Sequence, residues 1–171
     1  MQGDSIFPLF ADVPDGGHCR TGSGALVSNP TSVAFSNRGF YARVLGGKAG
    51  VSSLDIHVGV QSGNVSVAVY RNNGLLGTAA RPTGSPVATS GSVACPATGR
   101  QTISLGSTVD INAGDWLFLS ADNSTATFGR FPSAGVMATL PGVAYYQASA
   151  HPAPTVGSLA DIDRVFYIEA P

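Results

Sequence analysis

Acidic and histidine side chains are the residues in this sequence whose chemistry could support catalysis. Asp55 and His57 stand two residues apart, so on a β-strand both would point to the same side of a sheet. That spacing suits a general acid and base. A serine, cysteine or threonine that the pair could activate is not visible beside them. We therefore interpret Asp55 and His57 as a surface pair.

Metal binding has two weak candidates. Asp161 and Asp163 stand two residues apart and could contribute oxygen ligands to calcium, although capping of a turn is the favoured interpretation. His18 and Cys19 are adjacent, but neither has another histidine or cysteine at the spacing of a metal site. The sequence therefore predicts no metal site and no cofactor.

A glycosidase would need two carboxyl groups roughly 5–10 Å apart in a cleft. Glu169 is the single glutamate, so such a pair would have to come mainly from aspartates. Asp110, Asp115 and Asp122 stand at expected strand ends and turns, where aspartate side chains bond the backbone. We predict that the protein is not an enzyme.

Aromatic residues offer a binding role instead. Tyr145 and Tyr146 stand in a stretch rich in Ala, Pro and Gly, which predicts a long loop, and exposed loops often carry function. Tyr145 and Tyr146 are therefore candidate contacts for a receptor or a glycan. Trp116 belongs to the most apolar segment, Trp116–Ala121, and is expected in a core or an interface. Because both faces of this segment are bulky, we expect it to be a central strand or to meet a partner protein with one face.

The elements that position these residues show a period of two, which is typical of strands. In the segment 51–60, Leu54, Ile56 and Val58 share one face. A turn at 61–64 then leads to alternating valines, which predicts a hairpin. The further expected strands lie near residues 86–90, 100–105, 108–111, 116–121, 125–130 and 164–169.

Composition favours an all-β fold. The chain has 22 Gly and 11 Pro in 171 residues, which suits many turns between short strands. Lys48 and Glu169 are the only residues of their types, although a helical protein would use both freely on its surface. The sequence predicts an antiparallel, jelly-roll-like β-sandwich over residues 25–171.

Residues 1–24 differ from the rest of the chain and are expected to form an extended arm. The arm contains an apolar group, Ile6, Phe7, Leu9 and Phe10, followed by a segment rich in Gly, Asp and Pro. We predict that these four side chains anchor the arm on its own sandwich or on a neighbouring subunit.

The low content of charged residues limits the kinds of partner that the protein can bind. Only 11% of the residues are charged and the formal net charge is −1, which argues against nucleic-acid binding and against electrostatic attachment to a membrane. Such a surface is either covered by neighbouring proteins or made soluble by Ser, Thr, Asn and Gln. No segment approaches the ~20 apolar residues of a membrane span, and no secretory signal peptide is visible.

We interpret Cys19 and Cys95 as reduced, with a disulfide as the alternative.

Four segments in order carry a family resemblance: 62–71 (SGNVSVAVYR), 74–77 (GLLG), 90–96 (SGSVACP) and 111–117 (INAGDWL). This succession resembles small β-sandwich domains of tailed-bacteriophage structural proteins, which occur in head-decoration proteins, tail-tip proteins and fibre knobs. The resemblance covers roughly residues 50–130 and consists of turn and strand patterns. The same pattern would suit a carbohydrate-binding sandwich.

The resemblance implies a virion component that is commonly a homotrimer, with no catalysis and no cofactor. The expected partners are the major capsid protein or other virion proteins, and the expected location is the virion, assembled in the host cytoplasm. We favour capsid decoration, because a short chain without a shaft cannot extend far as a fibre. The alternative is a tail-associated domain that binds a receptor or a host-surface glycan through Tyr145 and Tyr146.

Overall fold

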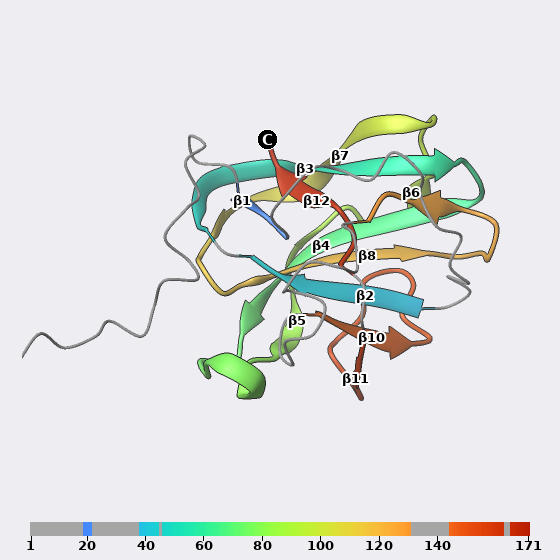
Figure 1. Cartoon of the computed structure of the whole chain (residues 1–171). Helices are drawn as coiled ribbons and strands as arrows, with labels where there is room; N and C mark the ends of the chain where they lie inside the picture. The colour runs from blue at the N-terminus through green and yellow to red at the C-terminus, as the bar shows by residue number, and fades with distance from the viewer. Residues whose placement is uncertain (1–18, 22–37, 45, 131–143, 163–164) are drawn as a thin grey trace, which may run out of the picture.

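A computed structural model describes residues 19–21, 38–44, 46–130, 144–162 and 165–171. It confirms an all-β fold in which two antiparallel sheets pack face to face (Figure 1). One sheet contains β1 (Cys19–Arg20), β12 (Ile168–Ala170), β3 (Lys48–Val60) and β7 (Gly99–Ile111), with β9 (Thr127–Phe128) also paired to β3. The other contains β11 (Ala160–Asp161), β10 (Ala144–Ala148), β2 (Arg38–Arg43), β8 (Trp116–Ala121), β4 (Asn64–Asn72) and β5 (Pro82–Thr89), with β6 (Val93–Ala94) paired to β4. A single 3-10 turn, η1 (Gly77–Ala79), lies between β4 and β5.

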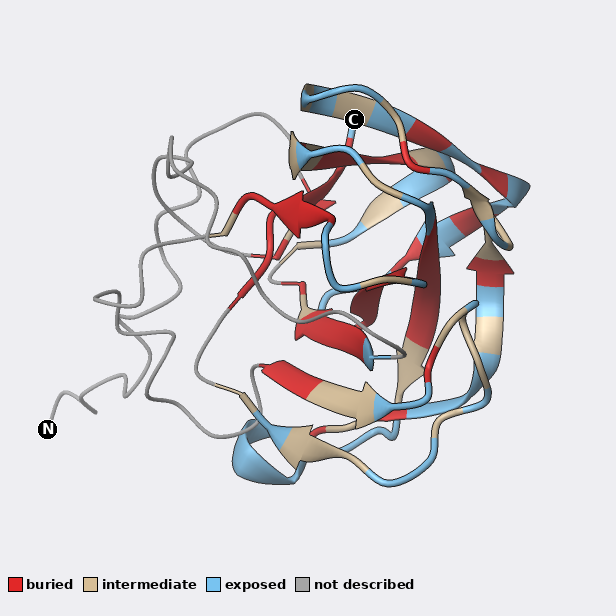
Figure 2. Cartoon of the chain, turned by 90° about the vertical axis from the view of Figure 1, so that its right-hand side faces the viewer, coloured by how far each residue is buried: buried red, intermediate tan, exposed pale blue. Residues whose placement is uncertain are grey.

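The main core lies between the two sheets, where buried residues gather in Figure 2. The alternation seen in the sequence produces it, because every second side chain of a strand faces the same way. Strand β8 is buried along its whole length and lies between β2 and β4, so the expectation of a central strand is confirmed. The core side chains include Leu54, Ile56 and Val58 from β3, Val65, Val67 and Val69 from β4, and Leu117 and Leu119 from β8.

The hairpin predicted from residues 51–60 and 65–70 was wrong. Strands β3 and β4 belong to different sheets, and the turn at 61–63 carries the chain from one layer to the other. Alternation alone does not distinguish the two arrangements, because each strand needs only one apolar face. Here the apolar faces of β3 and β4 meet across the core instead of lying side by side.

Further segments differ from the sequence prediction: β2 was not predicted, and the strands expected at 125–130 and 164–169 overlap only the short β9 and β12. Residues 100–105 and 108–111 form the single strand β7, whose pairing with β3 is irregular between the partners Val51–Val109 and Ser53–Ser104. The expected loop around Tyr145 contains strand β10, which pairs with β2 on one side and β11 on the other.

A second apolar cluster covers the outer face of the larger sheet. It contains Tyr41, Tyr70, Trp116, Phe118 and Tyr145, all fully or almost fully buried. Small and apolar residues of the segment 149–159, which we call the strap, pack against these rings. The outward side of β8 is therefore covered by its own chain, which replaces the expectation that it meets a partner protein.

The end of the predicted arm joins the sandwich, because Cys19–Arg20 forms β1 and pairs with β12. The Thr21 hydroxyl donates to the Phe166 carbonyl at 2.6 Å, which fastens this strand. The predicted anchor residues Ile6, Phe7, Leu9 and Phe10 lie outside the described residues, as does most of the arm.

Cys19 and Cys95 are buried and unpaired in the structure. Burial raises the pKa of the Cys19 thiol to about 12 and also raises the pKa of Cys95. Since the thiolate is the reactive form, neither thiol is suited to nucleophilic chemistry.

Within the described part of the chain, no helix has the length and apolar character needed to cross a membrane.

Candidate functional site

A group of three charged side chains lies on the outer face of the smaller sheet. Asp55 on β3 and Glu169 on β12 are register partners, so the two carboxylates stand side by side across two neighbouring strands. Arg100 and Thr102 come from β7, on the other side of β3. The alternation that sends Leu54 and Ile56 into the core sends these polar side chains outward.

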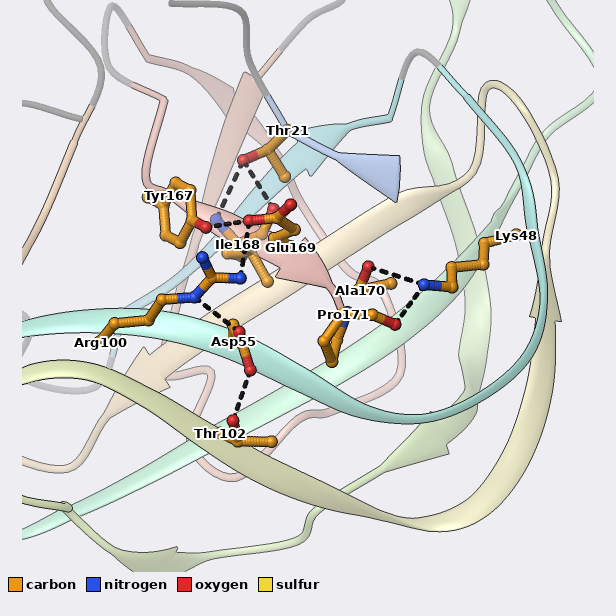
Figure 3. Close-up of polar contacts among 10 residues, drawn as sticks. All are labelled: Thr21, Lys48, Asp55, Arg100, Thr102, Tyr167, Ile168, Glu169, Ala170 and Pro171. Atoms are coloured by element: carbon orange, nitrogen blue, oxygen red, sulfur yellow. Dashed lines mark hydrogen bonds and ion pairs between the residues drawn. The ribbon is translucent and has the colours of Figure 1, made fainter. Parts of the chain in front are cut away.

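Figure 3 shows how Arg100 joins the two acids. Its Nε atom donates to Asp55 Oδ2 at 2.7 Å, and one terminal nitrogen donates to Glu169 Oε2 at 3.1 Å. The Thr102 hydroxyl donates to Asp55 Oδ1 at 2.6 Å, and the Tyr167 hydroxyl donates to Glu169. We call these five side chains the ionic cluster.

The carboxylates are almost completely buried, whereas the Arg100 side chain is 53% exposed. Like charges placed directly opposite on two strands repel each other, and the guanidinium offsets part of this repulsion by bonding both carboxylates. Burial together with bonding to Glu169 strongly raises the pKa of Tyr167, which keeps its hydroxyl protonated as a donor.

The chemistry open to this cluster is limited. A glycosidase needs one carboxylic acid that gives up a proton and one carboxylate that faces the substrate. Here one cation, the Arg100 guanidinium, bonds both Asp55 and Glu169 and occupies the oxygens that would face a substrate. Both groups also accept hydroxyl hydrogen bonds from the fold, so the arrangement fits stabilisation of the sheet better than acid catalysis.

The predicted surface pair of Asp55 and His57 needs correction. Asp55 is only 4% exposed, because strand β12 and Arg100 surround it. His57 packs on Gly129, where an added Cβ would lie 2.9 Å from the His57 Cβ, and its Nδ1 has no hydrogen-bond partner in the described structure. The two residues therefore have different surroundings despite sharing one strand.

A second polar site joins the strap to the larger sheet. His151 Nδ1 lies 3.0 Å from the hydroxyl of Ser120 on β8, and His151 Nε2 lies 3.0 Å from the hydroxyl of Ser92. The neighbouring Ser66 hydroxyl accepts the Ala153 amide at 3.2 Å. Burial lowers the pKa of His151, with Asp122 acting in the opposite direction.

This histidine holds the strap in place. A serine next to a histidine is also the arrangement of a nucleophile and its base. Ser120 is fully buried, however, and shares the His151 ring with Ser92. The contacts continue along the strap, where Tyr70 donates to the Pro154 carbonyl at 2.6 Å and the Val156 amide donates to Gly84.

The two tyrosines predicted to bind a receptor or glycan lie on strand β10 and not in a loop. Tyr145 is 1% exposed, because Trp116 and the Arg81 guanidinium cover its ring. Its predicted role as an exposed contact is therefore wrong. Tyr146 is partly buried, with Arg38 5.3 Å from its ring centroid, and its predicted role stays untested.

The turn aspartates behave as the sequence indicated. Asp122 accepts the Asn64 amide at 2.9 Å, and hydrogen bonds from Asn123 and Asn64 lower its pKa to about 2. Asp115 accepts the Asn112 amide at 2.9 Å and closes the turn before β8. Asp161 lies in β11, and Asp163 is outside the described residues. Across the described ranges, no group of three or more His, Cys, Asp or Glu side chains could hold a metal ion.

Sequence reasoning missed both polar sites because each joins distant segments. Asp55 and Glu169 meet only when β12 lies beside β3, and the pattern within either strand does not show this pairing. His151 meets Ser120 only when the strap folds back over β8. For the ionic cluster, the available sequence signal was Asp55, an acid at an outward position of the otherwise apolar strand β3.

Comparison with known proteins identifies no relative: no family model, no curated protein and no solved structure matches the chain.

Proposed function

We propose that this chain is a non-catalytic structural protein of a tailed-bacteriophage particle, bound to the outside of the capsid as a decoration protein. The observation that carries the non-catalytic part is the ionic cluster. Its two buried carboxylates are both bonded by Arg100 and by neighbouring hydroxyls, so their contacts serve the fold.

The virion setting is supported by the sequence resemblance, whose segments lie in β4, in β6, at the start of β8 and in the adjoining connections. The low charge of the chain is consistent with a surface that other proteins cover. We propose the major capsid protein as partner and a homotrimer as the assembled form, as is common for the domains that the sequence resembles.

The alternative of a tail-associated receptor-binding domain has less support. It depended on two neighbouring tyrosine rings, and Tyr145 is buried under the cation of Arg81. Stacking on a sugar requires a free ring face, which leaves Tyr146 alone to provide it.

The test is to locate the protein. Particles purified from the lysed host should contain the chain at a fixed, high copy number, measured by quantitative mass spectrometry. Gold-labelled antibodies should mark the head evenly. Labelling confined to the tail would replace decoration by the tail-associated alternative, and absence of the chain from purified particles would refute both.

A further inference from the structure

Two adjacent leucines protrude from the connection between β4 and β5. Leu75 is 52% exposed and Leu76 is 78% exposed, the highest value among the large apolar side chains of the described structure. The connection is the green turn at the lower end of the molecule in Figure 1. We propose that Leu75 and Leu76 form an apolar anchor that inserts into an uncharged socket of the protein on which this chain assembles.

The side chain of Asn73 holds the connection in one shape. Its Oδ1 atom accepts the amides of Leu75 at 3.1 Å and Arg81 at 3.2 Å, and its Nδ2 atom donates to the Ala79 carbonyl at 3.1 Å. Between Asn73 and Arg81, Gly74 and Gly77 adopt positive φ angles of 82° and 59°, which residues with a Cβ rarely adopt. These bends flank the two leucines.

The tip is also fastened to the core below it. Asn72 Nδ2 donates to the Leu75 carbonyl at 2.8 Å, and Asn72 Oδ1 accepts the indole nitrogen of the buried Trp116 at 3.2 Å. Arg81 donates to the carbonyls of Thr78 and Ala80. A tip that is already ordered loses less conformational freedom on binding, so exposed leucines there bind more tightly than on a mobile loop.

Charge indicates what kind of surface fits the anchor. Residues 72–80 contain no charged side chain. The flanking cations are engaged at the base of the connection, where Arg71 binds Asp115 at 2.5 Å and the Arg81 guanidinium lies 4.3 Å from the centroid of the Tyr145 ring. An uncharged tip of this kind fits an apolar socket without leaving a buried charge unpaired.

The occupant is a protein and not a membrane or a second copy in solution. Attachment to anionic lipid relies on basic residues beside the apolar group, and this tip has none. Two leucines cover much less than the ~800 Å² per partner of a stable protein interface. The anchor therefore works together with further contacts to a larger partner, and many copies on one lattice add avidity.

The proposal rests on the proposed function and is tested by adding purified protein to particles made without it. Bound protein is measured by co-sedimentation over a range of concentrations. We expect the double variant Leu75→Ser/Leu76→Ser to bind at least ~30-fold more weakly, the loss typical of an interface hot spot. The control is Val87→Ser, which removes a 40% exposed apolar side chain from β5 and should bind like the unchanged protein.

Each outcome decides between the two proposals. Equal binding of the leucine variant and the unchanged protein overturns the anchor while the proposed function stands. Failure of the unchanged protein to bind overturns both. Asn73→Ala keeps the leucines and loosens the connection, so a smaller loss of about 3–10-fold is expected from the lost preorganisation. Thermal unfolding midpoints near that of the unchanged protein confirm that the variants are folded.

Discussion

The outer faces of the two sheets bury their side chains by different means. On the smaller sheet, the ionic cluster places two carboxylates and a half-exposed guanidinium together. On the larger sheet, aromatic rings are covered by the strap, and the polar contacts there involve hydroxyls, amides and one histidine. The first face depends on charge balance, whereas the second depends on apolar area and neutral hydrogen bonds.

This difference indicates which face keeps its stability when salt, pH or a single charge is changed. Burial of large rings stabilises the fold at any salt concentration and in either protonation state of nearby groups. A buried ion pair contributes little net stability but becomes costly when one partner is removed. We therefore expect the aromatic face to supply most of the stability, and the ionic face to be sensitive to single charge changes.

The largest effect is expected from Trp116→Ala on the aromatic face. Trp116 is completely buried and its indole nitrogen donates to Asn72, so the change leaves a large cavity and an unpaired acceptor. Denaturant unfolding should show a loss of about 3–5 kcal/mol. Leu76→Ala, at a 78% exposed position, is the control and should change the free energy of unfolding by less than about 0.5 kcal/mol. A loss below about 1 kcal/mol for Trp116→Ala would contradict the comparison.

Removing the charge of Arg100 should have the next largest effect. Arg100→Met removes the cation that bonds both Asp55 and Glu169, which are register partners on neighbouring strands. We expect a loss of about 2 kcal/mol, less than for a fully buried pair because solvent screens the half-exposed guanidinium. Adding Asp55→Asn to this variant should restore part of the loss, as measured by urea unfolding. If the second change makes the protein still less stable, charge balance does not govern this face.

A smaller effect is expected at the strap. Tyr70→Phe removes the hydroxyl that donates to the Pro154 carbonyl and leaves the ring in place. The loss should be about 1 kcal/mol. Hydrogen exchange of the Ala153 and Val156 amides, which bond Ser66 and Gly84, should become faster. Unchanged exchange at both amides would show that this hydroxyl does not hold the strap.

The smallest effect concerns pH. Burial lowers the pKa of His151 in the folded protein below its ordinary value of 6.5, so the unfolded chain binds more protons below that pH. The stability contributed by neutral His151 is therefore complete above pH 6.5 and is lost as the pH falls towards the folded pKa. Thermal unfolding midpoints between pH 7 and 5 should fall less for His151→Gln than for the unchanged protein. Parallel curves would contradict a role for His151 in this pH range.

Local patterns predicted some strands, missed β2 and β10, and predicted the pairing partners of strands poorly. Trp116–Ala121 was identified to the residue, because six apolar or small residues between turn signals admit few other readings. The turn contact of Asp115 was also predicted, since its partner Asn112 is three residues away, whereas Asp110 and Asp122 bond the distant backbone amides of Gly50 and Asn64. The pairing of Asp55 with Glu169 was not predictable, because it depends on which strands become neighbours. Tyr145 was misplaced for the same reason: the Ala- and Gly-rich sequence around it resembles a loop until β2 and β11 pair with it.

We propose that this protein assembles on a particle and does not catalyse, and the decisive measurement is to add the purified protein back to particles made without it. The purified protein should bind to saturation at a fixed number of copies per particle and should raise the temperature at which the particles release DNA. Asp55→Asn should bind equally well, because Asp55 serves the fold. The contradictory result is no binding of the unchanged protein to particles, together with turnover of a bacterial surface polysaccharide that Asp55→Asn abolishes.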